Sequence, residues 1–172
     1  YSFTGTSFGD VANTTAPELT HPKGIRDISE WYMSFAMRPD YVRDVFAGQC
    51  EIGLANLKRV REAVGNRIDV IKITGADYGS QRGPLISPDF YRDMVKPFHL
   101  KLNTWIHEHT GWKTFMHCCG GIRPLLEDII DAGFDIISPV QTSAEGMEPA
   151  GLKRDFGDRI VFWGGGVETQ ST

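Results

Sequence analysis

One pattern recurs along the chain from Ile68 onward, and it constrains the fold more than any other feature. A short apolar run is followed by a glycine or polar break and then by an amphipathic stretch. Short apolar runs bounded by breaks predict strands, and amphipathic stretches predict helices. Strands that alternate with helices build a parallel sheet covered by helices. The sequence therefore predicts an α/β fold.

The pattern predicts strands and helices at defined places. The predicted strands are Tyr1–Thr6, Ile68–Thr74, Lys113–His117, Asp135–Pro139 and Arg159–Trp163. The predicted helices are Asp40–Val64, Pro88–Thr110 with Ser87 as N-cap, Ile122–Ala132 closed by Gly133, and Pro149–Phe156. The segment Ser7–Ser29, rich in Thr, Pro and Gly, is expected to be a loop long enough to form a lid.

Two architectures fit this alternation. A doubly wound sheet needs about five strands, but no Gly-x-Gly-x-x-Gly turn follows a strand to mark a dinucleotide site. A (β/α)8 barrel needs eight strands and usually about 250 residues, whereas the chain has 172. In both, the carboxyl ends of the strands form the functional face, so the side chains that follow them should converge. These side chains are Asp77, Tyr78, His117, Cys119, Gln141, Glu168 and Gln170.

His117 and Cys119 place a pair of soft-metal ligands at the end of a predicted strand. Because side chains alternate along a strand, both can face one side while Cys118 faces the other and packs in the core. Zinc binds imidazole nitrogen and thiolate sulfur, and a catalytic zinc site uses three protein ligands and leaves a fourth position open. We therefore predict a zinc site with two ligands identified. The alternative is a buried histidine beside a cysteine that packs as a small hydrophobe.

Five further residues are candidates for substrate contacts. Asp77 and Tyr78 follow a strand end, where catalytic residues gather, although Asp77 could instead cap its turn. Gln81 and Arg82 are candidate substrate-binding residues because an arginine can hold a carboxylate bidentately, and solvated loop residues are the alternative. Gln141 follows another strand end, where its amide would orient a ligand or close a turn.

Composition excludes several classes of partner. The chain carries 18 basic and 22 acidic residues, a net charge of −4, with no Lys/Arg cluster, so neither a nucleic acid nor an anionic membrane is an expected partner. A small-molecule substrate is expected instead. No apolar run approaches the roughly 20 residues that span a bilayer, and no signal peptide opens the chain. Three cysteines, two of them adjacent, indicate reduced thiols, and we expect a cytoplasmic protein.

Four motifs occur in order along the chain, and together they are more specific evidence for a family than any one of them. They are Gly75–Pro88, His117–Gly121, Ser138–Gln141 and Gly164–Gln170. With these motifs, the stretch from about Ile68 to Gln170 resembles the uroporphyrinogen decarboxylase superfamily. The resemblance implies a (β/α)8 barrel. It also implies that residues 1–172 form one partial barrel domain of about five parallel strands, without the amino-terminal strands and without the last strand and helix.

The superfamily includes cofactor-free decarboxylases and zinc-dependent methyltransferases that act on methylated corrinoid proteins. The decarboxylase branch relies on an Asp, an Arg and a late His that lie outside this chain. The position of its loop Tyr corresponds to Thr6 or Ser7 in this chain. The methyltransferase branch carries His-x-Cys, which matches His117 and Cys119, and a third ligand near the last strand that is missing here. The resemblance therefore favours zinc-dependent methyl transfer between a methylated corrinoid protein and a thiol or similar acceptor.

Two alternatives to this function stay open. One is a cofactor-free uroporphyrinogen decarboxylase of porphyrin biosynthesis, and the other is a barrel that binds a corrinoid protein or its cofactor without catalysis. The tetrapyrrole or corrinoid pocket is common to all three. Because the third ligand and part of the barrel wall are missing, we expect this stretch by itself to be inactive.

Overall fold

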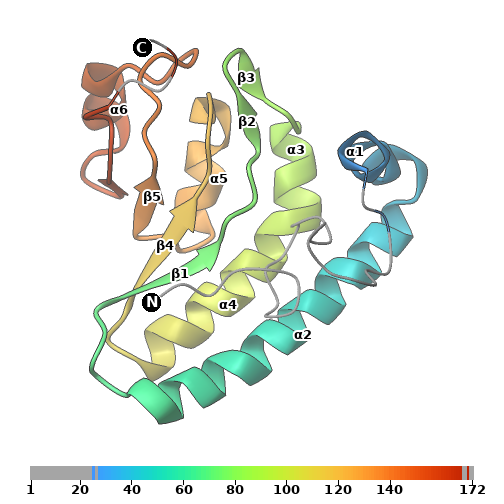
Figure 1. The fold of residues 1–172 in the computed structure, drawn as a ribbon, viewed down its shortest axis with the longest axis vertical. Helices are drawn as coiled ribbons and strands as arrows, with labels where there is room; N and C mark the ends of the chain where they lie inside the picture. The colour runs from blue at the N-terminus through green and yellow to red at the C-terminus, as the bar shows by residue number, and fades with distance from the viewer. Residues whose placement is uncertain (1–24, 26, 168–169, 171–172) are drawn as a thin grey trace.

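A four-stranded sheet forms the centre of the computed structural model, which describes residues 25, 27–167 and 170. Its strands are β1 (Val70–Thr74), β4 (Lys113–His117), β5 (Ile136–Ser138) and β6 (Val161–Phe162), in the order β1-β4-β5-β6. All three pairings are parallel, and helices connect the strands (Figure 1). The predicted α/β fold is thereby confirmed. Four predicted strands are found, and the fifth, Tyr1–Thr6, lies outside the described residues.

The described helices cover one face of this sheet. The long helices α2 (Pro39–Val64) and α4 (Lys96–His109) lie side by side (Figure 1), and α4 also contacts β4 and α5 (Leu126–Asp131). On the helix-covered face the strand residues are fully buried, namely Ile71, Ile73, Thr114, Met116 and Ile137. On the opposite face Phe115 is half-buried, and Val161 and Trp163 are more than half exposed. The candidate site described below is formed by side chains on the side of this open face.

The predicted helix Pro88–Thr110 is divided into three parts. It begins as α3 (Pro88–Phe90), where the Ser87 side chain accepts a hydrogen bond from the Phe90 amide at 3.1 Å, as an N-cap does. A π-helical turn, η2 (Tyr91–Val95), then leads into α4. The reason is Pro97, which has no N–H and whose ring crowds the carbonyl four residues earlier. The wider turn relieves this crowding.

The two later helices have nearly the predicted bounds. The predicted helix Ile122–Ala132 begins as a 3-10 turn, η3 (Arg123–Leu125), continues as α5, and is closed by Gly133 at a φ of 84°. That positive φ favours glycine, so Gly133 ends the helix as predicted. Helix α6 (Pro149–Phe156) has the predicted bounds.

Helix α1 (Ile28–Met37) was not predicted, and its first turn corrects the loop expected over Ser7–Ser29. The Asp27 carboxylate accepts a hydrogen bond from the Glu30 amide at 2.8 Å, which caps the helix. Trp31 and Phe35 then pack against Phe46 of α2. Apart from residues 25 and 27–29, the proposed lid segment lies outside the described residues.

A short hairpin follows β1 and was also not predicted. Its strands are β2 (Gly79–Ser80) and β3 (Gly83–Pro84), which pair antiparallel, so Gln81 and Arg82 form its turn. The hairpin extends beyond the carboxyl end of β1 (Figure 1). It therefore lies at the end of the sheet where the candidate site is expected.

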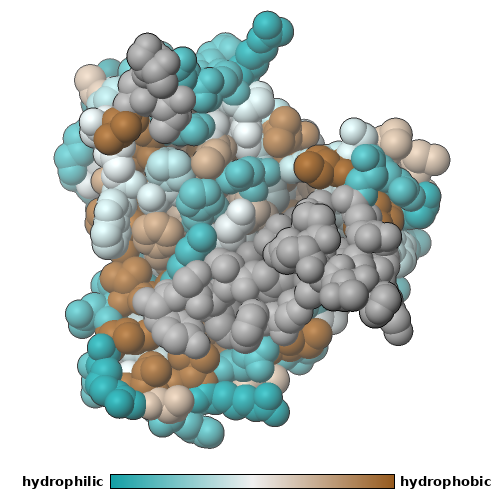
Figure 2. Space-filling view, viewed as in Figure 1, coloured by the Kyte–Doolittle hydropathy of each residue, from teal (hydrophilic) through white to brown (hydrophobic). Residues whose placement is uncertain are grey.

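The surface mixes polar and apolar side chains. Figure 2 shows hydrophobic atoms in separate patches between hydrophilic ones on the visible face. Within the described part of the chain, none of the helices combines the length and the hydropathy that crossing a bilayer requires.

Candidate metal centre

Three donor atoms converge at the carboxyl ends of β1 and β4. The Cys119 Sγ lies 3.5 Å from the His117 Nε2, and the Asp77 Oδ1 lies 3.7 Å from the same nitrogen. All three potential ligand atoms lie within 4.8 Å of one another. His117 ends β4, whereas Asp77 follows β1, so two neighbouring strands supply the cluster.

The separations of these donors fit a bound zinc ion. With bonds of about 2.0–2.3 Å in tetrahedral geometry, ligand atoms lie roughly 3.3–3.8 Å apart. The two separations that involve the His117 Nε2, 3.5 and 3.7 Å, fall within that range. An imidazole, a thiol and a carboxylate are also a ligand set that zinc accepts. The residues present therefore fit the metal. Asp77 is a candidate third ligand within this chain, in a different place from the third ligand that the resemblance implies near the missing last strand.

Asp77 is held by contacts that involve its backbone and its side chain. The Tyr32 hydroxyl of α1 donates a hydrogen bond to the Asp77 carbonyl at 2.9 Å. The Asp77 Oδ1 accepts a hydrogen bond from the Cys119 amide at 2.8 Å. The carboxylate therefore organises the loop that carries Cys119 as well as facing the donor cluster. Sequence reasoning missed Tyr32, whose helix was detectable from the capping pair Asp27 and Glu30.

Two glycines let the loops after β1 and β4 touch backbone to backbone. A Cβ on Gly79 would lie 2.4 Å from the Cys119 carbonyl oxygen. A Cβ on Gly120, whose φ is +85°, would lie 2.4 Å from the Gly79 carbonyl carbon. Real Cβ atoms do not approach so closely, and a positive φ already favours glycine. This contact brings Asp77 and Cys119 together.

Gln141 connects the third strand to the same loop. It follows β5, and its Oε1 accepts a hydrogen bond from the Gly120 amide at 2.6 Å. Side chains from the β1 and β5 loops thus bind consecutive amides, those of Cys119 and Gly120. The structure therefore brings Gln141 to the cluster, where its carbonyl oxygen positions the loop.

Electrostatics favour a neutral imidazole and a protonated thiol in the metal-free site. Burial lowers the pKa of His117, and the Lys72 charge lowers it further, whereas Asp77 raises it. Burial raises the pKa of Cys119 to about 11, and the neighbouring Asp77 charge adds to this. A metal ion at this place would therefore bind an imidazole that is already neutral, and it would displace the proton of the thiol.

Tyr78 does not lie with these residues, which corrects the placement expected from the sequence. Its side chain is only 2% exposed and packs edge-on against Tyr91 and near His99 in the core. Because Asp77 faces the open end, the next side chain points into the interior. Cys118 is fully buried, as predicted, and its Sγ accepts a hydrogen bond from the Tyr78 amide at 3.2 Å.

The remaining predicted residues lie around the cluster or outside it. Gln81 is half-buried in the hairpin turn, and its carbonyl accepts a hydrogen bond from the Glu145 amide at 2.9 Å. Arg82 is exposed at the same turn. Their predicted contacts with substrate stay predictions. Gln170 is exposed, and Glu168 lies outside the described residues.

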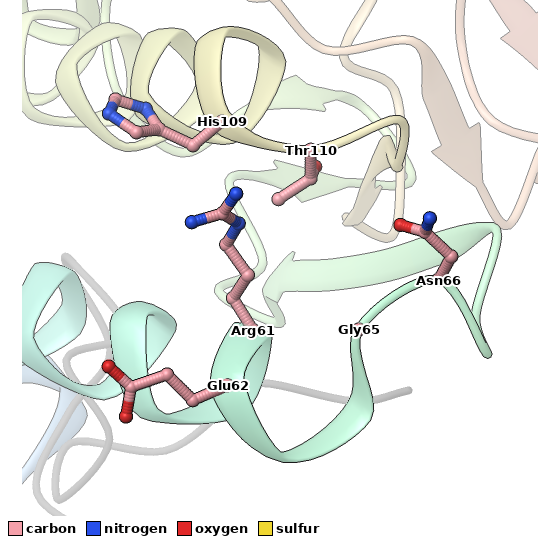
Figure 3. A pocket seen from close by; sticks show the side chains of 6 residues that line it. All are labelled: Arg61, Glu62, Gly65, Asn66, His109 and Thr110. Atoms are coloured by element: carbon pink, nitrogen blue, oxygen red, sulfur yellow. The ribbon is translucent and has the colours of Figure 1, made fainter.

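A hollow of about 260 Å³ lies at the opposite end of the molecule (Figure 3). It is lined by Arg61, Glu62, Gly65, Asn66, His109 and Thr110, where α2 and α4 end. In Figure 3 the Arg61 guanidinium points toward Thr110, and the Glu62 carboxylate points away. This hollow adjoins the amino ends of the strands, whereas folds built on parallel sheets bind their ligands at the carboxyl ends of the strands. The strand carboxyl ends remain the candidate site.

Fold and site together define a class of structure: a parallel sheet with helices on one face and, at its strand ends, a cluster of side chains that could hold a metal ion. A solved structure of similar fold is a methyltransferase from Methanosarcina mazei, with a TM-score of 0.52 and 21% sequence identity. The similarity covers 77% of this chain and 36% of that one, so this chain spans about a third of its length. At this identity the likeness establishes the fold alone. No family model matches the chain, and no curated protein resembles it in sequence.

Proposed function

We propose that this chain is part of a (β/α)8 barrel of the uroporphyrinogen decarboxylase superfamily, and that the whole barrel performs zinc-dependent methyl transfer. The main observation behind this proposal is the cluster of Asp77, His117 and Cys119 at the carboxyl ends of adjacent parallel strands. Sequence motifs at the same strand ends support the superfamily, and the fold of the methyltransferase neighbour supports the type of reaction. The sheet has two edges, β1 and β6, which the remaining strands of a barrel would pair with.

In this proposal His117, Cys119 and Asp77 hold the zinc ion, and the fourth position receives the acceptor. Bound zinc would lower the pKa of an acceptor thiol so that it is a thiolate near neutral pH. The chain's own residues orient the ligands: Asp77 fixes the Cys119 amide, and Gln141 fixes the Gly120 amide. We propose a methylated corrinoid, carried by a partner protein, as the methyl donor.

Zinc binding tests this function directly. We expect the chain to retain about one zinc ion after dialysis, and His117→Ala and Cys119→Ala to lose it, as measured by elemental analysis. His109→Ala and Cys50→Ala are matched controls, since His109 is exposed at the far end of α4 and Cys50 is buried in α2. Zinc content that stays unchanged in the His117 and Cys119 variants would contradict the proposal. Decarboxylation of a tetrapyrrole by metal-free protein would favour the decarboxylase instead.

The role of Asp77 as a ligand is tested by Asp77→Asn. The amide oxygen of asparagine can still accept the Cys119 hydrogen bond, but it is neutral and a weaker zinc ligand than a carboxylate. We expect the zinc affinity to fall roughly 10–100-fold, measured by competition with a chelating dye. Asp44→Asn, an exposed site on α2, is the matched control. Equal affinities in the two variants would remove Asp77 from the ligand set.

A further inference from the structure

His99 and Asn103 form a buried polar pair that the candidate metal centre does not use. Both side chains are fully buried, and they lie four residues apart on α4, so they share one face of that helix. The His99 Nε2 and the Asn103 Oδ1 have no hydrogen-bond partner among the residues that the structure describes. A buried polar atom without a partner is costly, so most such atoms in folded proteins bond to the protein or to an ordered water molecule.

The π-helical turn η2 adds Tyr91 to this pair. In a regular α-helix, residues eight positions apart lie about 80° apart around the helix axis. A π-helical turn contains one extra residue, so across η2 two residues eight positions apart can share a face. The Tyr91 hydroxyl accordingly lies 3.0 Å from the His99 Nδ1. Tyr91, His99 and Asn103 therefore form one buried polar row along α4.

The Tyr91 hydroxyl determines which nitrogen of His99 carries the hydrogen. Burial raises the pKa of Tyr91 and lowers the pKa of His99 to about 3, so the phenol keeps its hydrogen and the imidazole is neutral. Among the described residues, the His99 Nδ1 is the hydrogen-bond partner of this hydroxyl. If Nδ1 donated to the phenol oxygen, the phenol hydrogen would have no acceptor. Nδ1 therefore accepts, and Nε2 carries the hydrogen of the neutral ring.

The orientation of the Asn103 amide is determined by a second hydrogen bond. Its Nδ2 donates to the Ala132 carbonyl at 2.8 Å. The reverse orientation would place the amide oxygen against that carbonyl oxygen, and neither of them can donate. The buried pair therefore offers one donor, the His99 Nε2–H, and one acceptor, the Asn103 Oδ1, which do not bond to each other.

A water molecule has the size and the hydrogen-bonding capacity to join these two atoms. It accepts from Nε2–H and donates to Oδ1, so both buried atoms gain a partner. Cβ atoms four residues apart on a helix are about 5–6 Å apart. A water molecule with two hydrogen bonds of about 2.8 Å joins atoms roughly 4.5–5.5 Å apart. Beside His99 the surroundings are apolar, since the Phe134 ring lies edge-on to the imidazole with centroids 5.2 Å apart.

We propose that His99 and Asn103 bind one buried water molecule, which completes a hydrogen-bonded row from Tyr91 to the Ala132 carbonyl. Ala132 is the C-cap of α5, so the row joins the π-helical turn and α4 to the end of α5. The water site needs no metal ion, and it therefore stands or falls separately from the proposed function.

Crystallography and NMR test the two parts of this inference. In crystals of the full chain we expect a density peak within about 2.6–3.2 Å of both the His99 Nε2 and the Asn103 Oδ1. In long-range proton–nitrogen correlation spectra at about pH 8.5, where ordinary imidazoles are neutral, His99 should show a protonated Nε2 and an unprotonated Nδ1. His109 is the internal control with the opposite tautomer, because its Nδ1 donates to the Trp105 carbonyl at 2.8 Å.

A variant makes the test specific to the water. Asn103→Leu removes the acceptor and fills the space beside His99, so we expect the density peak to be lost and the His99 tautomer to stay. Asn66→Leu, at an exposed position, is the matched control and should keep the peak. A direct contact between the His99 Nε2 and the Asn103 Oδ1 with no density between them would overturn the proposal. An unprotonated Nε2 in the unmodified chain would overturn it as well.

Discussion

Replacing Gly120 by alanine is expected to destabilise the chain strongly and to abolish zinc binding. The new Cβ would lie 2.4 Å from the Gly79 backbone, and the residue would have to adopt a φ of +85°. Backbone strain and overpacking each cost about 1–3 kcal/mol, so we expect a loss of roughly 3 kcal/mol in the free energy of unfolding. Denaturant unfolding measures this loss, and Tm should fall by roughly 6–12 °C. Since the two loops must separate, Asp77 and Cys119 would no longer lie together.

Two further glycine variants make this prediction specific. Gly48→Ala lies in the middle of α2 with nothing within 4 Å of the new Cβ, and we expect it to be neutral or to stabilise the helix by up to about 1 kcal/mol. Gly79→Ala introduces the steric clash without a positive φ, so it should cost less stability and still reduce zinc affinity. If Gly120→Ala unfolds at the same denaturant concentration as Gly48→Ala and binds zinc equally, close contact of the loops is not required.

Replacing Asp128 by asparagine is expected to cause the second largest loss in the free energy of unfolding. Its carboxylate, 8% exposed, binds Lys96 at 2.9 Å and Arg92 at 2.9 Å, and so joins α5 to the π-helical turn and α4. Removing one partner of a buried ion pair leaves the other charge without compensation. Because Arg92 is half exposed, we expect a loss of about 2–3 kcal/mol, at the low end for buried pairs. Asp131→Asn on the same helix is the control, since its side chain is 55% exposed.

The effect of Asp128→Asn should depend on pH in one direction. Burial alone would raise the pKa of Asp128, but the hydrogen bonds and charges of Arg92 and Lys96 outweigh burial and lower it. A carboxyl group whose pKa is lowered in the folded state stabilises the fold at pH values above its unfolded-state pKa, about 3.9. This stabilisation is lost as the pH falls through the folded-state pKa. The difference between variant and unmodified chain should therefore be full at neutral pH and shrink below about pH 4. Urea unfolding at pH 7 and pH 3 measures it, and a difference that grows in acid would contradict this account.

The sequence predicted the repeating elements of this fold because their patterns are local. The apolar run that forms β4 and the amphipathic stretch that forms α2 contain their own periodicity, so their bounds were nearly correct. Helix α1 was missed because the preceding residues are rich in Thr, Pro and Gly, although Asp27 and Glu30 carry a capping pattern. The π-helical turn was missed because a proline within a helix can be accommodated in several ways, which packing decides.

The candidate site was only partly predictable, because only part of it follows from a local sequence pattern. Alternation along one strand determined that His117 and Cys119 face one side while Cys118 packs inward, and the structure agrees. That Asp77 lies beside them and that Tyr78 is buried depended on strand register and on two glycines in contact. Asp77 and Cys119, which share a hydrogen bond, are about 40 positions apart in the chain. Only the tertiary structure brings them together, because no local pattern specifies which loops meet.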